Sequence, residues 1–296
     1  MALCCIPGLA EGRKLKIGVT LHPYYSWVKN IADDTIEVIP LIPESSDPHS
    51  YQPRPADIKR LEDLDAVVIN GLGHDEFIKP MLKASGREDI RKIDPHKGLP
   101  LIPVFQKTYA FEKEKSADSE QVSYNSHTYI AITGAIQQIH TISRELGLLD
   151  PPDARLYRNN ARAYAKRLRR MLGGALEKIN AADVGDVRIA TVHDGYAYLM
   201  QELGLEIAAV IQPRHGIEPN PRQLQDTIRR IREAKVNILF AEMDYDKKYV
   251  DIIFEETGCR LYLLSHVSHG KYAPELFEQK MQENLDSIVK AVTDGK

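Results

Sequence analysis

Short apolar runs rich in β-branched residues alternate with stretches of helical spacing in the first part of the chain. The runs cover residues 16–21, 36–42, 65–69 and 99–104, and each has the length of a strand. Residues 55–64 begin with proline and place apolar side chains three and four positions apart, as in a short helix. Strands that alternate with helices form a parallel sheet covered by helices, so the pattern predicts an α/β lobe.

The same alternation returns near the C-terminal end of the chain. Four apolar runs predict strands and three helical patterns accompany them: strands at 187–192, 205–211, 236–241 and 260–264, and helices at 196–203, 220–231 and 274–292. Asn220 and Pro221 begin the second of these helices, since asparagine is a preferred N-cap and proline suits the first helical position. A second α/β lobe is therefore predicted.

Residues 153–182 differ from both halves, because apolar side chains follow helical spacing there without a break. A helix of roughly 28 residues is about 40 Å long, too long for a crossover inside one small lobe. The predicted fold is α/β, with two Rossmann-like lobes that have parallel sheets and are joined by one long rigid helix. The predicted divisions are a terminal segment at 1–12, a first lobe at 13–150, the linking helix at 151–182 and a second lobe at 183–296.

Composition is that of an ordinary globular protein, with 43% hydrophobic and 27% charged residues among 296. The net charge of −3 gives no electrostatic signature of a nucleic-acid partner. The basic run at 167–170 falls on the helical pattern and predicts a solvated helix face. No run of about 18 apolar residues occurs, so no transmembrane helix is predicted.

The three cysteines are Cys4, Cys5 and Cys259, and no C-x-x-C pair is present. This spacing argues against a zinc ribbon or a thioredoxin-type site, and Cys259 is expected to be a small buried apolar residue. Residues 1–12 have three interpretations: the end of a secretory signal peptide, a lipoprotein signal that ends at Cys4 or Cys5, or a disordered terminus.

Candidate metal ligands lie among the ten histidines. His49 follows the second predicted strand, His193 directly follows the strand at 187–192, and His127 precedes a helical run at 130–146. Ligands of open α/β sheets bind outside the carboxyl ends of the strands, where successive loops converge. Each histidine alone could be a cap or a core residue, but together they suit an ion that binds imidazole nitrogen.

Four segments resemble motifs of the cluster A-I (A-9) metal-binding receptors of ABC transporters. Residues 47–53, DPHSYQP, are similar to D-P-H-x-Y-x-P, and residues 193–198, HDGYAY, are similar to H-x-A-F-x-Y. Residues 125–129, NSHTY, resemble D-P-H-x-W with Asn-Ser for Asp-Pro and Tyr for Trp. Residues 216–221, GIEPNP, look like G-x-x-P-x-P, and the resemblance runs from about residue 14 to about residue 292.

The resemblance implies two lobes joined by a single helix and a metal ion in the cleft between them. It implies that His49 and His127 bind the ion from the first lobe and His193 from the second. Manganese-preferring relatives usually carry Glu where His193 stands. Because manganese prefers oxygen ligands and zinc accepts imidazole, three histidines predict Zn²⁺ as the bound ion.

The fourth ligand departs from the pattern of the family. Relatives carry an Asp after the last strand, but residues 264–270, LSHVSHG, contain none. His266 is the predicted fourth ligand, with His269 second and a water molecule third.

Other polar residues near strand ends have weaker cases. His22 and His74 lie where they could line the cleft, either as ligands or behind them. Three acidic residues also lie near strand ends, where an acidic fourth ligand stays open, although helix capping or exposure to solvent explains them as well: Glu242, Asp244 and Asp246. Three further histidines are expected to be surface or structural residues: His96, His140 and His215. The loop at 111–120 is charged but contains no histidine, so no histidine-rich scavenging loop is predicted.

The predicted function is high-affinity capture of Zn²⁺ outside the cytoplasm and its delivery to an ABC transporter permease in the cytoplasmic membrane. The protein is expected to be a periplasmic or otherwise extracytoplasmic monomer, with a lipid anchor on an N-terminal cysteine left open. Affinity should fall as the pH drops toward about 6, because the ligands must be deprotonated. The alternatives are a manganese or iron receptor of the same family, a receptor for an organic ligand such as a siderophore, an adhesin role, and a zinc hydrolase with Glu242 as base.

Overall fold

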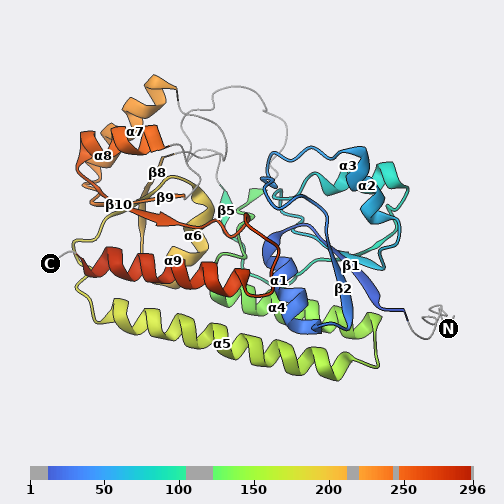
Figure 1. Ribbon diagram of the computed structural model, residues 1–296. Coiled ribbons are helices and arrows are strands. Elements are labelled where there is room, and N and C mark those ends of the chain that lie inside the picture. Colours follow the sequence, from blue (N-terminus) through green and yellow to red (C-terminus); the bar gives the residue numbers. More distant parts are fainter. Residues whose placement is uncertain (1–12, 105–122, 212–219, 243–246, 295–296) are drawn as a thin grey trace.

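The computed structural model describes residues 13–104, 123–211, 220–242 and 247–294 (Figure 1). Several sequence predictions concern parts outside these ranges: the segment 1–12, the loop at 111–120, His215, Asp244 and Asp246.

The first lobe contains a parallel sheet with the strand order β2-β1-β3-β4. Its elements are β1 (Leu15–Val19), α1 (His22–Ala32), β2 (Ile36–Pro40), α2 (Pro55–Ile58), β3 (Ala66–Val68), α3 (Ile78–Ser85) and β4 (Arg91–Ile93). The sequence predicted that residues 99–104 form a strand of this sheet, and that prediction was wrong. Only β5 (Pro103–Val104) forms there, and it pairs antiparallel with β6 (Ser123–Tyr124) in a separate ribbon. Pro100 and Pro103 have no N–H to donate to a central ladder, and β4 occupies the sheet edge instead.

The second lobe repeats the arrangement, with a parallel sheet of order β10-β9-β7-β8. Its elements are β7 (Ile189–Thr191), α6 (Ala197–Glu202), β8 (Ile207–Val210), α7 (Pro221–Glu233), β9 (Ile238–Glu242), α8 (Lys247–Thr257), β10 (Arg260–Leu264) and α9 (Leu276–Thr293). The predicted cap of α7 is confirmed, because Asn220 Oδ1 accepts a hydrogen bond from the Gln223 amide. The α/β fold with two parallel-sheet lobes is confirmed.

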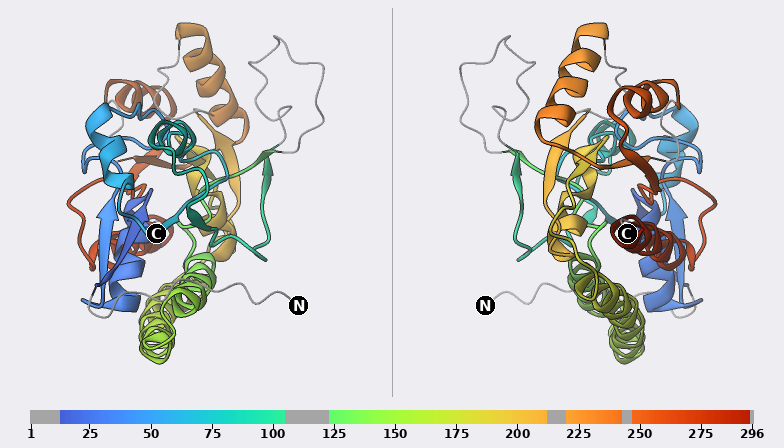
Figure 2. Two further views of the ribbon diagram at one scale, coloured as in Figure 1. Left: turned by 90° about the vertical axis from the view of Figure 1, so that its right-hand side faces the viewer. Right: turned by 90° about the vertical axis from the view of Figure 1, so that its left-hand side faces the viewer.

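Helix α5 (Ala154–Asn180) is the predicted long helix, with 27 residues and a length of about 40 Å. It runs beneath both lobes and lies against α4 (Ile132–Leu149), on the side of the molecule away from the loops that follow the strands (Figures 1 and 2). Its buried stripe includes Tyr157, Tyr164 and Leu168, while its basic residues lie mostly on the exposed faces. None of the described helices combines the length and apolar character of a membrane span.

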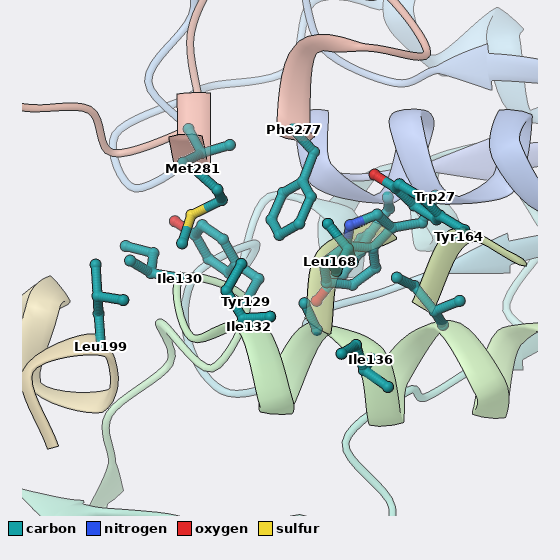
Figure 3. Packing of buried hydrophobic residues seen from close by; sticks show 14 of the residues in the cluster. Trp27, Tyr129, Ile130, Ile132, Ile136, Tyr164, Leu168, Leu199, Phe277 and Met281 are labelled. Atoms are coloured by element: carbon teal, nitrogen blue, oxygen red, sulfur yellow. The ribbon is translucent and has the colours of Figure 1, made fainter. Parts of the chain in front are cut away.

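One of the apolar clusters among the described residues spans both lobes. Trp27 of α1 is fully buried and meets the ring of Phe277 of α9 edge-on, with 5.1 Å between ring centroids. Tyr164 and Leu168 of α5 belong to the same core (Figure 3). The lobes therefore share packed side chains as well as the connecting helix. This core contains residues from both sides of the predicted boundaries at residues 150 and 182. It therefore does not test where one lobe ends and the next begins, and those divisions stay a prediction.

Candidate metal centre

Five histidines converge between the lobes, each from a loop after a strand. His49 follows β2, His74 follows β3, His127 follows β6, His193 follows β7 and His266 follows β10. Their ring centroids lie between 3.8 Å and 6.1 Å apart in the pairs that include His49. We refer to these five residues as the histidine cluster. Parallel strands bring their carboxyl ends to one edge, so two facing sheets can place loop residues of both lobes together.

The separations within the cluster suit ligands of one ion. His49 Nε2 and His127 Nε2 are 3.1 Å apart. Two nitrogens that bind one ion at about 2.1 Å lie about 3.0 Å apart at a right angle and about 3.4 Å apart at the tetrahedral angle. The cluster contains two overlapping triads, and within each triad the possible ligand atoms lie within 4.8 Å of one another: His49–His74–His127 and His127–His193–His266. His127 belongs to both triads and links the lobes.

Burial differs within the cluster. His49 is exposed, whereas the other four histidines are 0% to 5% exposed. The site is therefore closed on most sides, and His49 marks its solvent-facing edge.

The loop that carries His49 is fixed by its own carboxylates. Asp47 accepts hydrogen bonds from the His49 amide at 3.0 Å and from Ser50 Oγ at 2.9 Å. The Tyr51 hydroxyl donates a hydrogen bond to Asp57, whose carboxylate also accepts a hydrogen bond from the Arg54 amide at the start of α2. These contacts explain why the segment 47–53 contains Asp47 and Tyr51, because both residues fix the loop on either side of His49.

His74 is held by a glycine-containing turn at 70–75. The buried Asp75 carboxylate accepts hydrogen bonds from the Asn70 amide at 2.6 Å and the Gly71 amide at 2.9 Å. Gly71 and Gly73 have φ values of 69° and 95°, which side chains with a Cβ rarely adopt. The turn thus aims His74 into the cluster, where it joins the predicted ligands.

Asn125 orients His127. Its Oδ1 accepts from the His127 amide at 3.0 Å and lies 2.8 Å from His127 Nδ1, so the ring can donate from Nδ1 and present Nε2 to an ion. Asn125 also donates to the Asp194 carbonyl of the second lobe at 2.8 Å.

Tyr129 bridges two imidazoles. Its hydroxyl lies 3.2 Å from His74 Nε2 and 3.2 Å from His266 Nδ1. Burial holds the pKa of Tyr129 well above its ordinary value, so the hydroxyl keeps its single proton. The hydroxyl can donate to at most one of the two rings, and a ring that offers its other nitrogen to an ion must donate to the Tyr129 oxygen. The tautomers of His74 and His266 are therefore coupled through Tyr129.

His193 has two neighbours at one nitrogen. Its Nδ1 lies 3.1 Å from the Gly195 amide, which donates to it, and 3.3 Å from Glu242 Oε1. Both side chains are buried. One nitrogen cannot accept from Gly195 and donate to Glu242 at the same time. The tautomer with Nδ1–H gives up the bond from Gly195, donates to Glu242 and leaves Nε2 as the metal-binding nitrogen, and the carboxylate favours this tautomer.

The four predicted ligands His49, His127, His193 and His266 lie together, and His74, whose part in the site the sequence left open, lies beside them. The N-G-L-G segment before His74 was the available signal. His269 and His22 lie outside the metal-binding groups found among the described residues. His269 Nδ1 is 3.1 Å from Ser268 Oγ.

His22 instead ties the lobes together. Its Nε2 lies 3.0 Å from the Gly270 carbonyl and its ring stacks on Tyr272 with 4.0 Å between centroids. Burial, together with the charge of His269, lowers the pKa of His22 to about 4. Elsewhere, His96 is buried beside Asp94 and His140 is exposed on α4, so both have the structural or surface roles expected.

The chain matches a protein-family model described as ZnuA, Zinc-uptake complex component A periplasmic, over residues 17–291. It is 44% identical to the SBP FpvC of Pseudomonas aeruginosa solved in complex with Mn²⁺, with a TM-score of 0.88 and coverage of 96% of this chain and 100% of that one. FpvC in complex with Ni²⁺ gives 44% identity, coverage of 96% and 98%, and a TM-score of 0.86. The manganese ABC transporter substrate-binding lipoprotein PsaA of Streptococcus pneumoniae is 23% identical over 95% of this chain and 90% of its own length.

Proposed function

This chain belongs to the ZnuA family and is a metal-binding ABC transporter substrate-binding protein, and from this premise we propose that it captures a divalent metal ion through its histidine cluster and delivers it to a permease. The relatives' roles and the family description support a place outside the cytoplasm, where relatives are named as lipoproteins. We expect a monomer without catalytic turnover.

The convergence of five imidazoles from both lobes carries this proposal. An ion bound by His49 and His127 on one side and His193 and His266 on the other would cross-link the lobes. Binding would thus favour the arrangement in which the lobes face each other closely. The exposed edge at His49 provides the route by which an ion enters from solvent.

Zinc is the proposed ion on chemical grounds. Neutral imidazole is a preferred ligand of Zn²⁺, while Mn²⁺ prefers carboxylate, carbonyl and water oxygens. Among the described residues, the metal-binding groups at the cluster consist of histidine alone.

A six-coordinate ion such as Ni²⁺, Fe²⁺ or Mn²⁺ is a second candidate, and two observations favour it. Zinc sites usually use four ligands, and this cluster offers a fifth imidazole in His74. FpvC, at 44% identity, was solved with Ni²⁺ and with Mn²⁺. Imidazole also suits iron and nickel.

Calorimetric titration of the metal-stripped protein with Zn²⁺, Ni²⁺, Fe²⁺ and Mn²⁺ tests the proposal, with elemental analysis of the protein as purified. Removing an outer partner of a ligand typically costs 10–100-fold in affinity, so His49→Ala and His193→Ala should each cost at least about 100-fold. His140→Ala, on the exposed face of α4, is the matched control and should bind as the wild type does. Unchanged affinities in both cluster variants would refute the assignment of the site, and Ni²⁺ or Fe²⁺ binding tighter than Zn²⁺ would replace zinc by the second candidate.

A further inference from the structure

Gly195 lies at the centre of the histidine cluster. It is buried in the short 3-10 helix Asp194–Tyr196 that follows β7. Its φ is not in the left-handed region, unlike that of Gly71 or Gly204, so the backbone there does not demand glycine. Another constraint must account for a residue without a side chain at this point.

The constraint is space between imidazoles. A Cβ added to Gly195 would lie 2.8 Å from His193 Nδ1, 3.1 Å from His266 Nε2 and 3.2 Å from His127 Cδ2, whereas ordinary contacts begin at 3.4 Å. Three of the five cluster rings thus approach the place that a methyl group would occupy. By contrast, a Cβ added to Gly173 or Gly174 of α5 would meet nothing within 4 Å.

His266 is the ring most directly affected at its binding atom. Its Nδ1 lies 3.0 Å from Ser268 Oγ and 3.2 Å from Tyr129 Oη, so Nε2 is the nitrogen that it would offer to an ion. A methyl group on residue 195 would stand beside that nitrogen. Restoring a 3.4 Å contact requires a shift of 0.6 Å at His193 (3.4 − 2.8) and 0.3 Å at His266 (3.4 − 3.1). The contact with His193 is at Nδ1 and not at the nitrogen assigned to the ion, whereas the contact with His266 is at the binding nitrogen itself. Metal–ligand distances hold within about 0.2 Å, so the shift at His266 would lengthen its bond to the ion beyond that tolerance.

We propose that Gly195 is a specificity-determining residue of the metal site. Its missing side chain lets His266 reach the ion that His193 binds, which gives the site more imidazoles than four-coordinate zinc requires. The inference rests on the proposed metal-binding function. According to this inference, Gly195 favours ions that take five or six ligands, such as Ni²⁺, over Zn²⁺, which needs only four.

Two departures from the receptor motifs meet at this point. Gly195 stands at the alanine position of the H-x-A-F-x-Y motif that residues 193–198 resemble, and His266 stands near the place where the resemblance implies an Asp. The Cβ position of Gly195 and His266 Nε2 are 3.1 Å apart, so the larger ligand occupies room that the smaller residue vacates. The two positions are therefore expected to be energetically coupled.

A double-mutant cycle measures this coupling. Kd values for Ni²⁺ and Zn²⁺ are determined by competition titration for the wild type, Gly195→Ala, His266→Asp and the double variant. Gly173→Ala serves as the matched glycine control. Co²⁺ absorption reports coordination number, because four-coordinate Co²⁺ absorbs visible light much more strongly than six-coordinate Co²⁺.

In the wild-type background, Gly195→Ala should weaken Ni²⁺ relative to Zn²⁺ by at least about tenfold and intensify the Co²⁺ spectrum, as expected when a ligand is displaced. In the His266→Asp background the same change should alter the ratio by less than about threefold, because the shorter side chain leaves room for the methyl group. Gly173→Ala should change neither readout.

Each other outcome decides against a particular claim. An unchanged Ni²⁺/Zn²⁺ ratio and Co²⁺ spectrum in Gly195→Ala, or equal losses for both ions, would overturn the inference while the proposed function stands. If the wild type binds none of these ions, the proposed function fails first. If Gly195→Ala does not fold, the double variant decides: its folding supports the coupling with His266, and its failure to fold overturns it.

Discussion

His22 is a buried imidazole at the start of α1, and its replacement by glutamine tests how strongly it affects acid stability. The ring bonds to the Gly270 carbonyl and stacks on Tyr272, and His269 acts on it electrostatically. Glutamine can still donate a hydrogen bond to the carbonyl but does not titrate. The variant should therefore lose some packing at every pH and should also lose part of the pH dependence of unfolding.

The sign and size of this effect follow from the pKa of His22, which burial lowers from 6.5 to about 4. As the pH falls through 6.5 the unfolded chain takes up a proton at His22, while the folded chain takes it up only near pH 4. Stability from the neutral ring is thus fully present above pH 6.5 and is lost as the pH falls toward 4. At 1.36 kcal/mol per pKa unit the whole loss is about 3 kcal/mol, of which about 2 kcal/mol falls between pH 7 and pH 5.

Urea unfolding of the metal-free protein in EDTA at pH 7 and pH 5 measures this difference. The wild type should lose about 2 kcal/mol more than His22→Gln between the two pH values. His140→Gln is the control for an exposed histidine whose pKa is lowered by partial burial and by Arg169 and Arg162, and its effect should be small. Equal losses in the wild type and His22→Gln would refute the reasoning that burial of this ring makes the protein acid-sensitive.

Three further substitutions have defined outcomes. Glu242→Gln removes the carboxylate 3.3 Å from His193 Nδ1 and should raise the zinc Kd about 10–100-fold in calorimetry, and an unchanged Kd would exclude a role in orienting the ring. Phe277→Ala removes a fully buried ring and should cost about 3–5 kcal/mol in urea unfolding, in one transition for both lobes. Two separate transitions would contradict the shared core. Asn220→Ala should lower stability by about 1 kcal/mol in the same assay through loss of the α7 cap, with metal affinity unchanged.

Periodicity predicted most of the fold because long buried faces leave strong patterns. The helix at 153–182 and the strand at 260–264 were placed to within a few residues. Short or irregular elements were not: β4 has only three residues and two of them are exposed, so Arg91–Ile93 lacks an apolar run. Conversely, the apolar residues at 99–104 suggested a sheet strand although their prolines prevent one.

The metal centre was predicted in part, because chain position shows which residues end a strand but not how far their side chains reach. His49 and His193 stand in recognisable motifs, and His266 was chosen for its place after the last strand. How far the buried His74 side chain reaches into the cluster depends on the turn made by Gly71, Gly73 and Asp75, and sequence spacing does not specify the shape of that turn. The crowding around Gly195 depends on three loops that meet in space, so no local pattern could reveal it.

The contacts between α1 and the region of α9 also constrain how the protein is made. Ser26 Oγ donates to the Ala273 carbonyl 247 residues away, and Trp27 packs on Phe277. At about 5–20 residues per second, roughly 10–50 s of synthesis separates these partners. During that interval Trp27 lacks the ring of Phe277, and the cluster lacks His266 until almost the same point. Completion of the metal site is thus tied to synthesis of the second lobe, so a nascent chain that ends before His193 would have only the first-lobe histidines with which to compete for metal.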